Sequence, residues 1–111
     1  MRMVIAFVQP FMAPQVVGAL HQVPGLTGAT FTDGHGFGRG RPTDAPTSEV
    51  LYGTAAKVRI EVMVRDDLEA VVVRAIREAA HTGNRGDGKI YVLPVDRALR
   101  IATDEEGDEA V

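Results

Sequence analysis

The chain contains no cysteine among its 111 residues. This absence excludes disulfide bonds, thiolate metal sites and a cysteine nucleophile, and it is typical of proteins from a reducing compartment. A long apolar run is also missing, because the N-terminal stretch 1–8 ends just before Pro10. A stretch of this length cannot span a bilayer, and it shows no signal-cleavage pattern. We therefore interpret it as a buried strand.

An excess of positive charge is missing too. The 12 Lys and Arg residues are outnumbered by 15 Asp and Glu, and much of the acid lies in the stretch 104–109, which we interpret as a solvated end. This balance gives no support to a nucleic-acid-binding surface. The three histidines lack paired metal-ligand spacing, which favours structural or solvated roles for them (His21, His35, His81). We expect a cytoplasmic protein with no histidine metal site and no membrane insertion.

The pattern of apolar residues predicts strands and helices in alternation. Residues 3–8 form a first strand, and Pro14 opens a helix with apolar residues at helical spacing (Val16, Val17, Leu20, Val23). Pro24 and Gly25 end that helix. Residues 26–33 form a second strand, and residues 57–64 alternate polar and apolar side chains, as a strand with one buried face does.

The second half of the chain repeats this order. Asp66 and Asp67 are predicted to cap a second helix and Gly83 to end it, with an apolar stripe between them (Leu68, Val71, Val72, Ala75, Ile76, Ala79, Ala80). Residues 90–95 form the fourth strand. The order βαββαβ predicts one α+β domain over residues 1–111 with a ferredoxin-like fold, in which two helices cover one face of an antiparallel sheet. The other face also needs cover, which favours oligomerisation.

The glycine-rich turn before the fourth strand carries the strongest functional signal. Gly86 and Gly88 let backbone N–H groups approach an anion, and Lys89 supplies a charge of the kind that phosphates bind. The spacing of Gly83, Gly88 and Lys89 imitates a P-loop. Ile90, however, occupies the place of the magnesium-binding Ser or Thr, and a strand follows where a helix should. The sequence therefore argues against a Walker-type NTPase.

A second glycine-rich and cationic stretch, residues 34–41, leads into a long segment without usable periodicity. Residues 39–56 contain prolines, glycines and several Ser and Thr, and their length is unusual for so compact a domain. Loops of this kind are usually functional or disordered. Glycine-rich turns are common by themselves, but two of them in one small domain suggest a binding function.

Four motifs follow one another along the chain: Gly36-Phe37-Gly38-Arg39, Lys57-Val58-Arg59-Ile60-Glu61-Val62, Thr82-Gly83 followed by Gly86-Asp87-Gly88-Lys89-Ile90, and Arg100-Ile101 with Thr103. In order and approximate spacing they resemble the PII signal-transduction family over essentially the whole chain. The resemblance implies a compact homotrimer of ferredoxin-like subunits that binds ATP or ADP in clefts between subunits. It also implies a regulatory protein that is not an enzyme. Its long T-loop, residues 39–56, would dock on a target transporter, enzyme or transcription regulator.

The resemblance also assigns nucleotide contacts. The B-loop, residues 82–89, would hold the phosphates (Gly86, Asp87, Gly88, Lys89), and Arg100 from the C-terminal segment 96–111 would reach across from a neighbouring subunit. Further contacts would come from the base of the T-loop and from the sheet (Thr30, Gly36, Phe37, Gly38, Arg39, Glu61, Met63). An ATP tail needs backbone donors together with Lys and Arg to replace its water, which agrees with this set. Mg²⁺ would accompany bound ATP.

The chain departs from the family pattern at positions that bear on its ligands. Ala102 stands in place of a second arginine at the phosphates, which leaves the preference between ATP and ADP open. Gly40 stands in place of a glutamine that helps to hold magnesium and 2-oxoglutarate, which predicts a weak or absent response to that effector. Lys57 matches the lysine that meets the effector's carboxylate, although a lysine that opens a strand is more often a plain solvated residue. Tyr52 does not fall at the family's uridylylation position.

Other interpretations stay open. Gly86 and Gly88 can form a plain tight turn, and Lys89 and Arg100 can be ordinary surface charges. A trimer of the copper-tolerance type, metal-binding or structural, shares this fold, but the glycine turn favours a nucleotide and the lack of cysteine disfavours a soft metal. We predict an ATP- and ADP-binding regulator of a transporter or enzyme, with nitrogen metabolism or the transport of bicarbonate or metal as its context. The sequence names neither the target nor the effector nor a T-loop modification.

Overall fold

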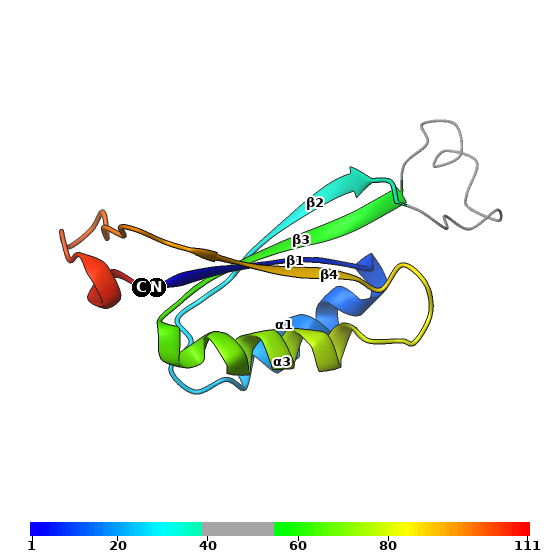
Figure 1. Cartoon of the computed structure of the whole chain (residues 1–111), viewed down its shortest axis with the longest axis horizontal. Helices are drawn as coiled ribbons and strands as arrows, with labels where there is room; N and C mark the ends of the chain where they lie inside the picture. The colour runs from blue at the N-terminus through cyan, green and yellow to red at the C-terminus, as the bar shows by residue number, and fades with distance from the viewer. Residues whose placement is uncertain (39–54) are drawn as a thin grey trace.

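Residues 1–38 and 55–111 are described by the computed structural model. They form β1 (Arg2–Val8), α1 (Ala13–His21), β2 (Thr30–Gly36), β3 (Ala55–Val64), α3 (Glu69–Ala80) and β4 (Gly88–Pro94), with short 3-10 helices at Pro10–Met12, Asp66–Leu68 and Gly107–Ala110. Figure 1 shows both helices on one side of the sheet. No helix in this part of the chain has the length and apolar character that crossing a membrane requires.

The strands form one antiparallel sheet in the order β2-β3-β1-β4. β1 pairs with both β3 and β4, so that Arg2 lies opposite Val64 on one side and opposite Pro94 on the other. β2 pairs with β3 at the edge, with Thr30 opposite Glu61. This strand order, with the two helices on one face, confirms the predicted ferredoxin-like βαββαβ fold.

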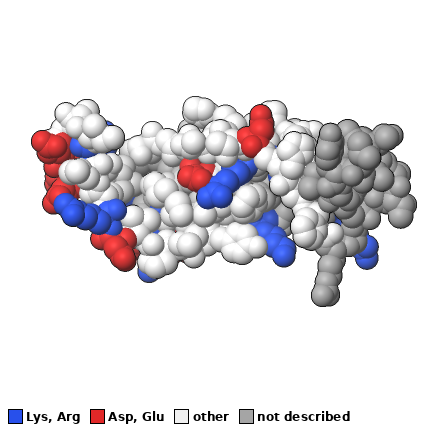
Figure 2. Space-filling model, turned by 90° about the horizontal axis from the view of Figure 1, so that it is seen from above, with Lys and Arg blue, Asp and Glu red and all other residues white. Residues whose placement is uncertain are grey.

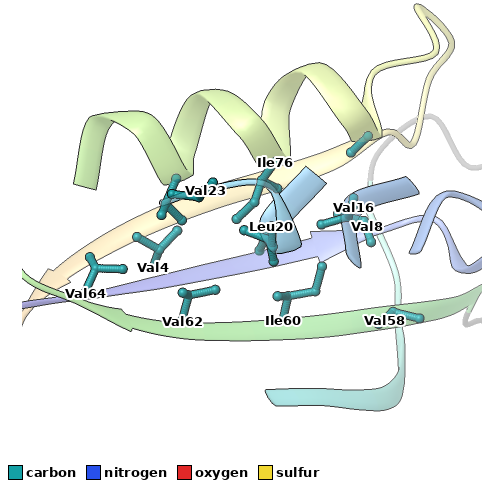
Figure 3. Packing of buried hydrophobic residues seen from close by; sticks show 13 residues of the cluster. Val4, Val8, Val16, Leu20, Val23, Val58, Ile60, Val62, Val64 and Ile76 are labelled. Atoms are coloured by element: carbon teal, nitrogen blue, oxygen red, sulfur yellow. The ribbon is translucent and has the colours of Figure 1, made fainter. Parts of the chain in front are cut away.

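The core lies between the sheet and the helices, as Figure 3 shows. It consists of aliphatic side chains from one face of β1 and β3, from the facing sides of α1 and α3, and from the turn after α1 (Val4, Ala6, Val8, Val16, Leu20, Val23, Val58, Ile60, Val62, Val64, Val72, Ile76, Ala80). The predicted alternation of β3 is confirmed, because every second residue from Val58 to Val64 is buried. No charged or polar side chain of the described residues is buried in this core.

Two predicted strands have shifted bounds. The second strand was expected over 26–33, but β2 runs from Thr30 to Gly36, because pairing with β3 continues to Gly36 opposite Ala55. Hydrogen bonds to a neighbouring strand here outweigh the low strand propensity of glycine. β4 begins at Gly88, two residues before the predicted start. The predicted T-loop, 39–56, overlaps β3 at Ala55 and Ala56, and its other residues lie outside the described ones.

The predicted caps of the second helix are wrong in detail. Asp66 and Asp67 do not cap α3 with their side chains. They lie in a 3-10 turn that precedes the helix, where Asp67 forms an ion pair with Arg65. At the other end α3 stops at Ala80, and Gly83 adopts its positive φ of 86° only after His81 and Thr82. Gly83 therefore belongs to the turn that follows the helix.

The face of the sheet away from the helices remains uncovered within one chain. Figure 2, which views the molecule from that side, shows a mostly uncharged surface with a cluster of acidic and basic residues at one end and a few more charged groups across the rest of the face. Apolar side chains are exposed on this face, including Tyr91 at 49% and both Met63 and Leu93 at 39%. A sheet face of this composition is suited to burial against other protein surface.

Candidate functional site

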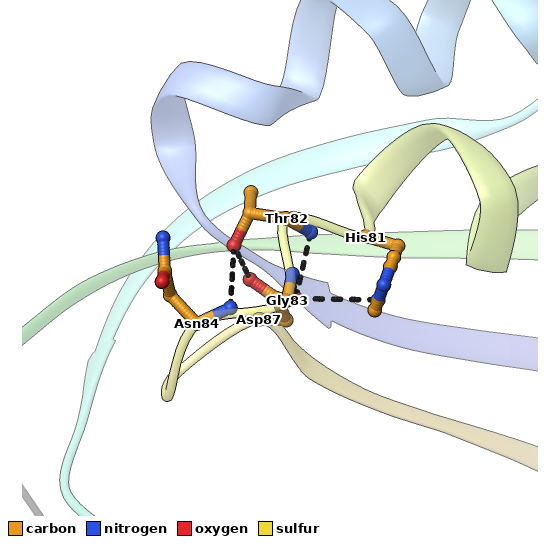
Figure 4. A network of polar contacts seen from close by, with 5 residues as sticks. All are labelled: His81, Thr82, Gly83, Asn84 and Asp87. Carbon is orange, nitrogen blue, oxygen red and sulfur yellow. Dashed lines mark hydrogen bonds and ion pairs between the residues drawn. The ribbon is translucent and has the colours of Figure 1, made fainter.

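The turn between α3 and β4 is organised around the carboxylate of Asp87 (Figure 4). Oδ2 of Asp87 accepts hydrogen bonds from the backbone N–H groups of Thr82 at 2.8 Å and Gly83 at 3.0 Å. The Thr82 hydroxyl donates a further hydrogen bond to Oδ1, and it accepts one from the N–H of Asn84 at 3.1 Å. One carboxylate therefore closes the turn on itself.

These hydrogen bonds lower the pKa of Asp87. The largest contribution comes from the Thr82 side chain, followed by the backbone N–H groups of Thr82 and Gly83, because each donor stabilises the ionised form. The imidazole Nδ1 of His81 lies 3.6 Å from Oδ2 and contributes when it is protonated. Asp87 is thus an anion with its charge directed into the turn.

Two glycines in this turn adopt backbone conformations with positive φ. Gly86 has a φ of 87° and Gly88 a φ of 113°, conformations that residues with a side chain rarely adopt. Gly88 lies opposite Val8 in the β1–β4 pair, and a Cβ atom there would lie 1.7 Å from the carbonyl oxygen of Phe7. The sequence interpretation of these glycines as a turn is confirmed, and the approach of Phe7 adds a reason that the sequence did not reveal.

Both lysines of the chain lie at this turn. Lys89 follows Gly88 at the start of β4, and Lys57 on β3 donates a hydrogen bond from Nζ to the carbonyl oxygen of Gly86 at 2.9 Å. Lys57 therefore has a defined structural contact and is not a plain solvated residue. Gln9, which the sequence reasoning did not single out, also reaches the turn, because its Nε2 would lie 2.8 Å from a Cβ at Gly86.

The open face of the sheet carries a second polar group beside the lysines. Arg59 lies opposite Phe7, which in turn lies opposite Lys89. The Arg59 guanidinium lies 5.7 Å from the centre of the Phe7 ring and donates a hydrogen bond to Glu61 at 2.7 Å. Glu61, a predicted nucleotide contact, is therefore already paired with a cation. The contact of Arg59 with Phe7 was not predicted, because the sequence does not show which residues face each other across strands.

The remaining predicted contacts form separate groups. Thr30 lies opposite Glu61, and Met63 lies opposite Met3 at the far end of the sheet. The positions of Met3 and Phe7 in β1 place Met63 roughly 13 Å along the strands from the level of Lys89. At the other end of β2, Gly36 pairs with Ala55, while Phe37 is 84% exposed and Gly38 follows it. Arg39 and Gly40 lie outside the described residues.

The C-terminal segment that contains Arg100 lies at the opposite end of the molecule from the glycine turn (Figure 1). The C-terminal segment folds back on itself, with Leu99 bridged to Glu106 and the Arg100 N–H donating to the carbonyl oxygen of Glu105 at 2.9 Å. The Arg100 side chain forms an ion pair with Glu105 at 3.6 Å, and Arg97 pairs with Glu106 at 2.9 Å. The acidic end is thus partly paired with arginine instead of being fully solvated.

A surface pocket of about 500 Å³ lies between this segment and the end of the sheet. Met63, Leu99 and Arg97 are among its lining residues. Among the described residues, no group of three or more His, Asp and Glu side chains is placed to hold a metal ion. Within one chain the structure therefore brings Lys57, Lys89 and the glycine turn together, and it leaves Met63 and Arg100 at the other end.

Comparison with known proteins identifies the fold family. Residues 1–105 match the family described as nitrogen regulatory protein P-II. The chain is 42% identical to the nitrogen regulatory protein P-II of Azospirillum brasilense and 41% identical to nitrogen regulatory protein P-II 1 of Escherichia coli K12, over the full length of each chain. The chain belongs to the P-II family. A crystal structure of Arabidopsis thaliana PII bound to citrate is similar, with a TM-score of 0.81 and 38% identity over 99% of this chain and 91% of that one.

Membership of the P-II family confirms several predictions at once. The protein is a regulatory, signal-transducing P-II protein and not an enzyme. The alternative of a copper-tolerance trimer is set aside, because full-length relatives at about 40% identity are P-II proteins. The glycine turn, Lys57 and Lys89 thus belong to a regulatory protein, and their chemistry has to be that of binding.

Proposed function

We propose that this P-II protein binds ATP and ADP at its glycine turn and regulates a target protein through residues 39–56. The observation that carries the proposal is the meeting of both lysines at one turn. Lys57 is hydrogen-bonded to Gly86, and Lys89 directly follows Gly88. Two lysines beside a glycine-rich backbone supply the positive charge, and the glycines allow the close approach, that a phosphate chain requires.

Asp87 has a structural role in this proposal. Its carboxylate would repel phosphate if it faced the ligand, but it accepts its hydrogen bonds from Thr82 and Gly83 within the turn. A turn closed in this way loses less conformational entropy when it binds a ligand. Asp87 would thus fix the shape of the turn while Lys89 and the glycine backbone contact the phosphates.

A complete site requires more than one subunit. The C-terminal segment that carries Arg100 lies at the opposite end of the molecule from the glycine turn, and the open face of the sheet exposes apolar side chains. We propose a homotrimer in which Arg100 of one subunit completes the site that begins at Lys89 of the next. Light scattering at micromolar concentration should give the mass of a trimer, and a monomer would contradict both the assembly and the intersubunit role of Arg100.

Calorimetry with ATP and ADP tests the nucleotide site. Lys89→Ala removes a charge-assisted contact, so affinity for both nucleotides should fall by roughly tenfold to a hundredfold. Arg74→Ala is the matched control, because it removes an exposed cation from α3 on the other side of the sheet and should leave both affinities unchanged. Unchanged ADP affinity in Lys89→Ala would remove Lys89 from the site.

The target of regulation is proposed by chemical class. The A. brasilense and E. coli relatives are named nitrogen regulatory proteins, which supports a transporter or enzyme of nitrogen metabolism as the target. A transporter of bicarbonate or metal is the alternative, since Gly40 and Ala102 depart from the family pattern. Affinity purification with ATP and Mg²⁺, and separately with ADP, should recover a target in one nucleotide state only. Equal recovery in both states would contradict nucleotide-dependent signalling.

A further inference from the structure

The contact between Lys57 and Gly86 joins two parts of the chain that are far apart in sequence. Lys57 lies on β3 opposite Gly34, and Gly86 lies at the tip of the turn between α3 and β4. The Lys57 ammonium donates to the Gly86 carbonyl oxygen at 2.9 Å across 29 residues of sequence. An ammonium group has three N–H donors, so Lys57 keeps two for other partners.

Gln9 meets the same glycine from the end of β1. Its Nε2 would lie 2.8 Å from a Cβ atom at position 86, while Nζ of Lys57 would lie 3.8 Å from that atom. Gln9 therefore occupies space beside Gly86 that a side chain would need, and Lys57 lies within van der Waals contact of the same position. Gln9 has no charge, so it can lie beside the lysine without electrostatic repulsion.

We propose that Gln9 and Lys57 are positioning residues that hold the Gly86 peptide in the conformation in which the turn binds nucleotide phosphates. The proposal rests on the nucleotide function proposed above. In this role the two side chains act through the backbone of the turn, and contact with the ligand is not required.

The physical reason lies in the freedom of glycine. A glycine at φ 87° with no side chain has many alternative conformations, so an unsupported turn would spend part of its time in shapes that cannot bind. A charge-assisted hydrogen bond to the Gly86 carbonyl oxygen restricts that freedom before the ligand arrives. Apparent affinity scales with the populated fraction of the binding-competent conformation, so losing this support weakens binding.

The test compares Lys57→Met and Gln9→Ala with the unchanged protein. Lys57→Met keeps most of the side-chain volume and removes the donor, and Arg74→Met is the control for loss of one exposed positive charge. Amide hydrogen exchange at Gly86, Asp87 and Gly88 is measured without nucleotide, and ADP affinity is measured by calorimetry. We expect exchange to become about threefold to tenfold faster and ADP affinity to fall by a similar factor in both variants.

A conservative variant distinguishes a positioning role of Lys57 from a nonspecific loss of structure. Lys57→Arg retains a donor that can reach the Gly86 carbonyl oxygen, so it should recover part of both the exchange protection and the affinity. Unchanged exchange in Lys57→Met and Gln9→Ala would overturn the proposal, and lower affinity with unchanged exchange would make Lys57 a direct ligand contact instead. Faster exchange with unchanged ADP affinity would also overturn the positioning role.

Failure of the nucleotide function would be distinguishable from failure of this proposal. If the unchanged protein binds neither ATP nor ADP, the function proposed above is wrong and so is the nucleotide role of the two side chains. The exchange measurement would still show whether Gln9 and Lys57 order the turn, because it uses no nucleotide.

Discussion

Gly88 and Phe7 approach so closely that a Cβ atom on Gly88 would lie 1.7 Å from the carbonyl oxygen of Phe7. Gly88 pairs with Val8 at the first position of β4, where the turn passes into the sheet. Its φ of 113° adds a second constraint, because a residue with a side chain is strained in that conformation. The β1–β4 pair and the glycine turn therefore depend on the same glycine.

Gly88→Ala should destabilise the protein by more than about 2 kcal/mol, because backbone strain and a clash with main-chain atoms add together. Gly34→Ala is the matched control: Gly34 also lies in a strand, but no atom lies within 4 Å of a Cβ placed there. Its substitution should cost less than about 1 kcal/mol. Urea unfolding followed by circular dichroism measures both, and equal stabilities for the two variants would contradict the clash.

The stability of the turn should depend on pH through Asp87. Its folded-state pKa is lowered by donors from Thr82 and Gly83, so its contribution to stability is fully present above the ordinary aspartate pKa of about 3.9. The contribution is lost as the pH falls through the lowered folded-state value. The Asp87→Asn variant should therefore have a lower free energy of unfolding than the unchanged protein at pH values above the ordinary aspartate pKa. This difference should shrink as the pH falls through the lowered folded-state pKa of Asp87.

Titration of the Asp87 carboxyl carbon by NMR measures the shift directly. Thr82→Val removes the largest contribution and leaves the backbone donors, so the pKa of Asp87 should rise part of the way toward its usual value. An unchanged titration curve in Thr82→Val would show that the hydroxyl does not bind the carboxylate in solution.

The elements that could be predicted from sequence are those determined by residues close together in the chain. β3 was predicted well, because its alternation of Val58, Ile60 and Val62 with polar residues reflects one buried face and is local in the sequence. The end of β2 was not predicted, because residues 34–36 are held in the sheet by pairing with β3. That pairing depends on a strand about twenty residues further along the chain, and local propensity cannot show it.

In the candidate site, too, local motifs could be predicted from sequence and contacts between distant segments could not. Gly86, Gly88 and Lys89 were predicted from sequence as site residues, because their signal is a short motif with a known physical use, and this assignment stays a prediction. Gln9 and the contact of Lys57 with Gly86 were not predicted, since they result from the meeting of three distant segments at the end of the sheet. Whether Arg39 contributes to the site stays a prediction, because it lies outside the described residues.

Mixed trimers provide a test of the intersubunit site. Lys89→Ala and Arg100→Ala should each weaken ADP binding as pure proteins. When the two variants are assembled together in equal amounts, about a quarter of the clefts should combine an intact Lys89 from one subunit with an intact Arg100 from its neighbour. Calorimetry should then recover a fraction of high-affinity sites. No recovery would show that both residues act within one subunit, whereas unchanged ADP affinity in pure Arg100→Ala would show that Arg100 is not part of the site.

The final prediction concerns 2-oxoglutarate, an effector that, from the resemblance to the PII family, would be held through magnesium and a glutamine. Gly40 occupies the glutamine's place and supplies no side-chain ligand, so magnesium would have to complete its octahedral shell with water. Lys57 could still attract a carboxylate, but its ammonium is already bonded to Gly86, and an exposed ion pair contributes only about 0–1 kcal/mol. We therefore expect weak or absent binding of 2-oxoglutarate to the protein loaded with ATP and Mg²⁺.

Isothermal titration of the ATP-loaded protein with 2-oxoglutarate tests this expectation. The Gly40→Gln variant should bind 2-oxoglutarate more tightly than the unchanged protein. Saturable micromolar binding to the unchanged protein would show that Gly40 does not prevent binding.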